Sequence, residues 1–262
     1  VRLRGQSLVH VHAAMFAMNI EKTHNGVNPL AHRVEGMVGG HILLGDIELV
    51  PDFSLRPRDF PGRLGPTVVG EIQFSTALPM AHNPESNTLG CDVKAGIYLR
   101  TFPHISAFIC VDIQYPWPPH GYPRIVLYYF SLPDPTPAFP LMQPSRVVNI
   151  GRELTAAERA AMTAQYPNVN AGNTFGNGFG GCGECHPAAD PTHFVFDIPG
   201  PTVLYVDANH TVGTNGLDIG AVPANVQVDC RVLLSRILIG ALSEDCPVAF
   251  GAYWPWNPMD FV

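Results

Sequence analysis

Three apolar segments rich in β-branched residues, all within residues 47–115, constrain the fold of this chain more than any other feature. Each is short enough to be a strand, and polar residues accompany them at positions that an apolar core would not select. The first segment meets Asp52, and the second carries Glu71 and Gln73, two residues apart. Residues two apart in a strand share a face, so Glu71 and Gln73 are predicted to project together. Asp52 and Glu71 can then converge on one divalent cation, because hard cations prefer carboxylate oxygens.

The first half of the chain alternates such segments with helix-compatible ones. We expect helices over residues 7–20 and 87–100, and strands over residues 33–38, 41–44, 47–55, 66–75, 105–115 and 124–132. The 41–44 and 47–55 strands are predicted to form a hairpin, Asn25-Gly26 a turn, and Ser86 or Asn87 the cap of the second helix. This order predicts a mixed α/β core in which helices flank a mixed sheet.

Polar residues recur in a set order through this region. They are Pro51-Asp52, Glu71-Ile72-Gln73, Ser75, Asp92, Lys94 and Tyr98. In this order residues 36–132 resemble the PD-(D/E)XK restriction-endonuclease-like superfamily, particularly its Uma2-like branch and related fungal proteins. The resemblance implies a restriction-endonuclease-like core that hydrolyses nucleic-acid phosphodiesters, with Mg²⁺ or Mn²⁺ held by Asp52 and Glu71.

The chain departs from the family signature at one position. The lysine expected two residues after the glutamate is replaced by Gln73. Related nucleases can carry that lysine on the next helix instead, and Lys94 lies where such a displaced lysine would be. The chain has only one other lysine, Lys22, so this position of Lys94 carries some weight. The resemblance therefore implies a catalytic set of Asp52, Glu71, Gln73 and Lys94. Because Gln73 carries no charge, a catalytically silent binding or assembly module with the same fold is the alternative.

The charge distribution argues against a general nucleic-acid-binding surface. The net charge is −7, with ten basic and ten acidic residues in 1–131 but five and twelve in 132–262. Nucleic-acid enzymes usually show a basic footprint. The local exception is Arg56, Arg58 and Arg63, which could clamp a phosphate or simply line a solvated loop. The acidic second half is a candidate surface for a protein partner or for homo-oligomer formation.

The second half is rich in turn-forming residues. Residues 133–144 are proline-rich, so we predict a nuclease-like core over 1–132 and a β-rich, Gly/Pro-rich extension over 133–262. The alternative is that the extension continues the same domain. A capping box, Thr155 to Glu158, predicts a helix to residue 166, and strands are expected at 192–198 and 202–206. Residues 226–242 fit either a helix or a strand. No apolar run approaches about 18 residues, so no membrane-spanning helix is expected.

The cysteines pose a separate question. Cys91 and Cys110 lie in apolar surroundings and are predicted to be small buried core residues. Cys182-Gly-Glu-Cys185-His186 matches the attachment signature of haem c, which would make the protein an electron-transfer protein. With His193 the same residues could instead hold a structural Zn²⁺, and a local disulfide or free thiols remain a third alternative. We expect no covalent haem, because the Asn- and Gly-rich segment before Cys182 offers little apolar surface to a porphyrin.

Two histidines near the start of the chain form a candidate metal pair. His10 and His12 would share a face in a strand and could then bind copper or zinc. The apolar spacing of residues 7–20 fits a helix better, and in a helix the two imidazoles point to different faces. The sequence therefore favours the helix, and a strand with a copper or zinc pair is the alternative.

Overall fold

The computed structural model describes residues 8–28, 33–44, 46–58, 65–75, 89–102, 104–115, 123–131, 142–152, 154–167, 169, 195–200 and 224–243. Its centre is a six-stranded sheet in the order β1-β4-β5-β6-β7-β8. These strands are β1 (Val34–Val38), β4 (Phe53–Pro57), β5 (Val68–Ser75), β6 (Ala107–Gln114), β7 (Ile125–Ser131) and β8 (Arg146–Asn149). The pair β5–β6 is parallel and the other four pairs are antiparallel. The prediction of a mixed α/β fold is confirmed.

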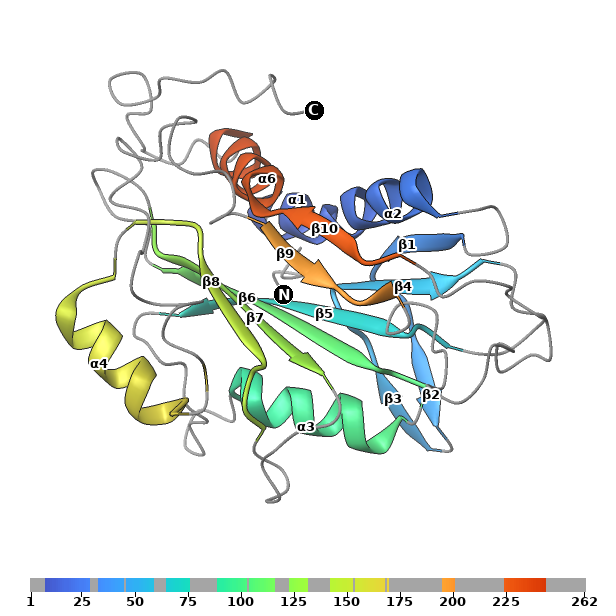
Figure 1. Cartoon of the computed structure of the whole chain (residues 1–262), viewed down its shortest axis with the longest axis horizontal. Helices are drawn as coiled ribbons and strands as arrows, with labels where there is room; N and C mark the ends of the chain where they lie inside the picture. The colour runs from blue at the N-terminus through green and yellow to red at the C-terminus, as the bar shows by residue number, and fades with distance from the viewer. Residues whose placement is uncertain are drawn as a thin grey trace, which may run out of the picture.

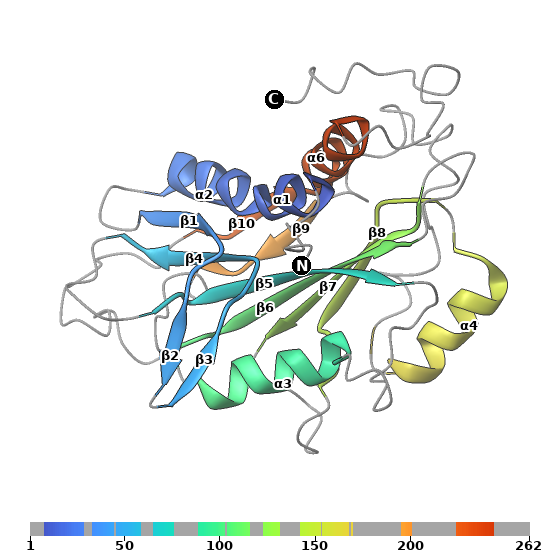
Figure 2. The ribbon, with the colours of Figure 1, turned by 180° about the vertical axis from the view of Figure 1, so that it is seen from behind.

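Helices cover both faces of this sheet (Figures 1 and 2). On one face lie α1 (Leu8–Ala14), α2 (Phe16–Val27) and α6 (Cys230–Ser243), and on the other lies α3 (Cys91–Thr101), which connects β5 to β6. A parallel pair of strands needs such a crossover connection. The fourth helix, α4 (Ala156–Gln165), contributes Met162 to the buried cluster on the α3 face.

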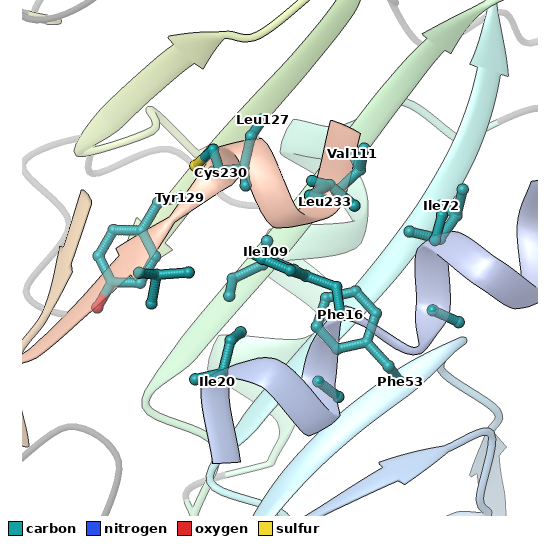
Figure 3. Close-up of a cluster of buried hydrophobic side chains, with 14 of the residues drawn as sticks. Phe16, Ile20, Phe53, Ile72, Ile109, Val111, Leu127, Tyr129, Cys230 and Leu233 are labelled. Carbon is teal, nitrogen blue, oxygen red and sulfur yellow. The ribbon is translucent and has the colours of Figure 1, made fainter. Parts of the chain in front are cut away.

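The core on the α1 face contains residues from both halves of the chain (Figure 3). Phe16 and Phe53 pack edge to face, with ring centroids 6.4 Å apart. Leu233 of α6 belongs to the same buried cluster, as does Val226 of β10 (Val226–Asp229), which pairs with β9 (Val195–Ile198). Each buried aliphatic side chain contributes roughly 1.5–3 kcal/mol. The described parts of residues 133–262 are therefore joined to the first half by a shared core.

One predicted strand is in fact two. Residues 47–55 divide into β3 (Ile47–Leu49) and β4, and these strands belong to different sheets. The expected hairpin is present, because β3 pairs antiparallel with β2 (Ile42–Leu44). Between β3 and β4 lies Pro51, which has no N–H to donate to a ladder. Asp52 consequently precedes β4 instead of ending a longer strand.

Three other local predictions need correction. The first helix is two helices and continues to Val27, so there is no turn at Asn25-Gly26. The Asn25 side chain instead donates to Val34 O and accepts from Val34 N, both at 2.9 Å. The N-cap of α3 is Gly90, whereas Ser86 and Asn87 lie outside the described residues. Cys91 and Cys110 are buried as predicted, but they are joined by a disulfide.

The ambiguous segment 226–242 resolves into both alternatives in succession. Its first four residues form β10, and α6 begins directly afterwards at Cys230. The expected strand over 192–198 corresponds to β9, and the expected strand over 202–206 lies outside the described residues. No helix in the described part of the chain is both long and apolar enough to cross a membrane.

Candidate functional site

The pairing of β4 with β5 brings the two predicted carboxylates together. Phe53 is the partner of Gly70, and continuing this antiparallel register by one pair places Asp52 opposite Glu71. Directly opposed residues in such a pair have Cβ atoms about 4.5–5.5 Å apart. The ring of Phe53 lies over Gly70, where an added Cβ would overlap it. A glycine at position 70 thus allows the close approach that aligns the two carboxylates.

Asp52 is held through both carboxylate oxygens. Its Oδ2 accepts a 2.7 Å hydrogen bond from the backbone N–H of Ile72. Its Oδ1 lies 2.6 Å from Nε2 of His10 in α1. The side chains of Asp52 and His10 are only 11% and 17% exposed, so this contact is shielded from most solvent. Asp52, directly before the first residue of β4, thus links the interior of β5 to α1.

Glu71 is held from the other side of the sheet. Lys94 Nζ lies 2.8 Å from Glu71 Oε2, and the Tyr98 hydroxyl donates a 2.8 Å hydrogen bond to Glu71 Oε1. Lys94 and Tyr98 are four residues apart in α3 and therefore lie on the same helix face. The lysine predicted to lie near the glutamate therefore forms an ion pair with it.

The pKa of Tyr98 is affected by both carboxylates. Burial raises its pKa above the ordinary value, and the charge and hydrogen bond of Glu71 raise it further. The charge of Asp52 acts in the same direction. Tyr98 therefore remains a neutral hydrogen-bond donor to Glu71 over the physiological pH range.

Gln73 and the arginines take other positions. Gln73 is buried two residues beyond Glu71, and its Oε1 lies 3.6 Å from Cys91 Sγ. Arg56 belongs to β4 and not to a loop, where its guanidinium is paired with its cross-strand partner Glu35. That pairing argues against Arg56 as a phosphate clamp. Arg58 is exposed just beyond β4.

Several predicted site residues lie outside the described residues. They are Arg63 and the possible haem or zinc ligands Cys182, Cys185, His186 and His193. Most of the acidic second half also lies there. Nothing in the described structure bears on haem c, on structural Zn²⁺ or on an acidic partner surface.

The donor set at Asp52 and Glu71 suits one kind of metal. Among the described residues there is no group of three or more His, Cys, Asp or Glu side chains placed to hold a metal ion. Mg²⁺ and its analogues do not require such a cage, because they bind through one or two carboxylates, waters and substrate phosphates. Two adjacent, largely buried carboxylates fit that chemistry, and a lysine stands beside one of them.

His10 is the residue that sequence reasoning did not connect to this site. The sequence offers a role for His10 only as a metal pair with His12. The structure confirms that both histidines lie in a helix. Its partner Asp52 is 42 positions away, so no local spacing could indicate the contact. Tyr98 was part of the resemblance but had no assigned role there.

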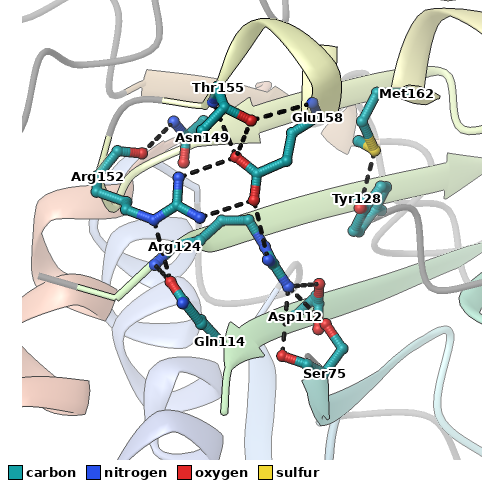
Figure 4. Close-up of polar contacts among 10 residues, drawn as sticks. All are labelled: Ser75, Asp112, Gln114, Arg124, Tyr128, Asn149, Arg152, Thr155, Glu158 and Met162. Carbon is teal, nitrogen blue, oxygen red and sulfur yellow. Dashed lines mark hydrogen bonds and ion pairs between the residues drawn. The ribbon is translucent and has the colours of Figure 1, made fainter. Parts of the chain in front are cut away.

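A second polar cluster lies at the C-terminal end of β5 (Figure 4). The fully buried Arg124 donates to Ser75 Oγ at 2.7 Å and lies 3.3 Å from Asp112 Oδ2. Its other terminal nitrogen lies 3.2 Å from Glu158 Oε1. Burial raises the pKa of Asp112, and hydrogen bonds from Ser75 and Arg124 oppose that shift. Ser75, which forms part of the resemblance, thus belongs to a network that joins β5, β6 and α4 through Arg124, the residue before β7.

Glu158 links this network to the predicted capping box. Its backbone N–H donates to Thr155 Oγ1, and its carboxylate accepts from Thr155 N, which confirms the box. Arg152 donates to both Glu158 oxygens, at 2.7 and 2.9 Å. Burial acts to raise the pKa of Glu158, but the bonds from Arg152 and Thr155 outweigh it and lower the pKa to about 2.

The lowered pKa of Glu158 predicts that the fold loses stability in acid. Because the folded-state pKa of Glu158 lies below its ordinary 4.5, its ionised form stabilises the fold above pH 4.5. That contribution is lost as the pH falls from 4.5 through about 2. Denaturant titrations at a series of pH values should show a weaker pH dependence in Glu158→Gln than in the wild type. Parallel curves for the two proteins would contradict the assignment.

Comparisons of the chain with protein-family models, with curated proteins and with solved structures find no match. The function is therefore inferred from the geometry of the site.

Proposed function

We propose that this protein is a metal-dependent phosphodiesterase that acts on nucleic acid at Asp52 and Glu71. The observation that carries the proposal is the 2.8 Å ion pair between Glu71 and Lys94. Through this pair, α3 supplies the cation that Gln73 cannot supply from β5. The mixed sheet, with a helical connection between parallel β5 and β6, is compatible with the restriction-endonuclease-like core that the sequence suggests.

The side chains of the site have separable tasks in such a reaction. Asp52 and Glu71 would hold Mg²⁺ or Mn²⁺, which when bound lowers the pKa of a water and polarises the scissile phosphate. His10 and the Ile72 N–H fix the orientation of Asp52, and Tyr98 fixes that of Glu71. Lys94, 25% exposed, can orient the attacking water or neutralise charge that develops on the phosphate.

One observation favours a second candidate, a non-enzymatic module with the same fold. Both oxygens of Asp52 and both oxygens of Glu71 already have partners within the protein. A carboxylate pair stabilised in this way can persist as a structural feature without a metal. The two candidates differ in whether the protein binds and uses a divalent cation.

A combined cutting and binding experiment separates them. The full-length protein is incubated with oligonucleotides and plasmid in Mg²⁺, Mn²⁺ or EDTA, and its thermal unfolding is followed in the same buffers. We expect cutting only with metal. When the metal is at 100 times its Kd, its binding should raise the free energy of unfolding by about 2.7 kcal/mol, and the Tm should rise with it.

The two lysines of the chain provide a matched pair of variants. Lys94→Met should reduce the cutting rate while the metal-dependent rise in Tm remains. Lys22→Met, on the exposed side of α2, should cut like the wild type. Absence of both cutting and a metal-dependent Tm shift would favour the non-enzymatic module.

A further inference from the structure

A series of rings leads away from Asp52 on the α1 face of the sheet. The first is His10, which contacts the Asp52 carboxylate. The ring of Phe74 in β5 has its centroid 6.2 Å from that of His10. The ring of Tyr115, just after β6, has its centroid 6.5 Å from that of Phe74. The series therefore connects the candidate metal ligand with the protein surface.

Tyr115 ends this series as an exposed but supported ring. It is 62% exposed, whereas Phe74 is partly buried against the core. Its backbone N–H donates to Ser75 O at 2.8 Å, which fixes the chain at the end of the sheet. Its ring meets Phe74 edge to face, at 81° between the planes. Among the exposed large hydrophobic residues in the described part of the chain, Tyr115 is the only aromatic one.

Three cations of the described region are engaged by acidic partners. Lys94 is paired with Glu71 and Arg56 with Glu35, while Arg124 is buried against Asp112 and Glu158. The chain as a whole has a net charge of −7. Binding of a nucleic-acid duplex depends mainly on Lys and Arg contacts to its phosphates. Because their charges are paired within the protein, Lys94, Arg56 and Arg124 offer little of that attraction.

Single strands can be bound in another way. Their unpaired bases stack on aromatic side chains, and each stacked base contributes roughly 1–3 kcal/mol with little dependence on sequence. An exposed ring that Phe74 and His10 connect to the candidate metal ligand suits an unpaired base, whereas the bases of a duplex stay stacked on one another. We propose, on the basis of the phosphodiesterase function proposed above, that the substrate is single-stranded nucleic acid and that Tyr115 stacks on an unpaired base of the bound strand.

The first test measures binding without cutting. A short single-stranded oligonucleotide containing 2-aminopurine is titrated with full-length protein in EDTA, and fluorescence anisotropy and quenching are recorded. We expect the wild type and Tyr115→Phe to bind and to quench the base. Tyr115→Ala should bind about 5- to 150-fold more weakly with little quenching, the range that corresponds to the loss of one stacked base.

The control substitutes another exposed hydrophobic residue of the described surface. Met18→Ala, on α2, should bind like the wild type. Circular dichroism should show all three variants to be folded, since both positions are exposed. Equal binding by wild type and Tyr115→Ala would overturn the proposed stacking.

The second test compares cutting of a single strand with cutting of the duplex of the same sequence, in Mn²⁺. We expect the single strand to be cut faster, and Tyr115→Ala to raise its KM more than it lowers kcat. A duplex cut at least as fast, with no effect of Tyr115→Ala, would overturn this inference and leave the proposed function intact. If neither substrate is cut, the phosphodiesterase function fails, and the inference that depends on it fails too.

Discussion

Asp52→Asn and Glu71→Gln should each lower the cutting rate at least about 100-fold, because each removes one of the two carboxylates that would hold the metal, whose charge stabilisation is worth several kcal/mol. Asn and Gln keep the shape of the side chain and one acceptor oxygen. In Asp52→Asn the hydrogen bond from Ile72 N can therefore persist, and the fold with it. The measurement is single-turnover cutting of an oligonucleotide in Mn²⁺.

Asp197→Asn serves as the matched control for these variants, because Asp197 is an exposed carboxylate of β9. It should cut at the wild-type rate. The metal-dependent rise in Tm should be lost in Asp52→Asn and Glu71→Gln and kept in Asp197→Asn. Cutting at the wild-type rate by either site variant would exclude Asp52 and Glu71 as the metal-binding pair.

Arg124→Met should have the largest effect on stability, a loss of about 3–5 kcal/mol in the free energy of unfolding. Arg124 and Asp112 are both fully buried, and removal of the guanidinium leaves the Asp112 carboxylate without its cationic partner. The carboxylate must then either remain charged in a medium of low polarity or bind a proton at neutral pH. Urea denaturation at pH 7 measures the loss.

Two further variants make this test specific. Arg124→Met combined with Asp112→Leu should recover part of the lost stability, because the double variant buries no unpaired charge. Arg56→Met removes an arginine from the ion pair with Glu35, in which both side chains are about half exposed, and should cost no more than about 1 kcal/mol. A loss in Arg124→Met as small as that in Arg56→Met would show that the buried pair is not a stabilising unit.

The sequence by itself predicted the elements whose signals are local. The strands β5, β6 and β7 are short segments rich in apolar and β-branched residues, interrupted by Glu71 and Gln73 in β5 and by Asp112 in β6. The helix α4 begins at a capping box that can be read within four residues. The approach of Glu71 to Lys94 was also expected, but from the resemblance of these residues to a nuclease pattern. In each case the information lies in neighbouring residues or in a motif of fixed order.

Only the tertiary structure decided the contacts between residues distant in the sequence. His10 contacts Asp52, and Arg56 is paired with Glu35. The ring of Phe74 contacts the rings of both His10 and Tyr115. The predicted strand is interrupted at Pro51, so Asp52 lies between β3 and β4. Only the register of Phe53 with Gly70 places Asp52 opposite Glu71. Periodicity and capping report the local preferences of the backbone, whereas strand order, register and helix packing depend on how the whole core is filled. The sequence therefore supplied the chemical groups of the site, and packing of the whole chain determined which of them meet.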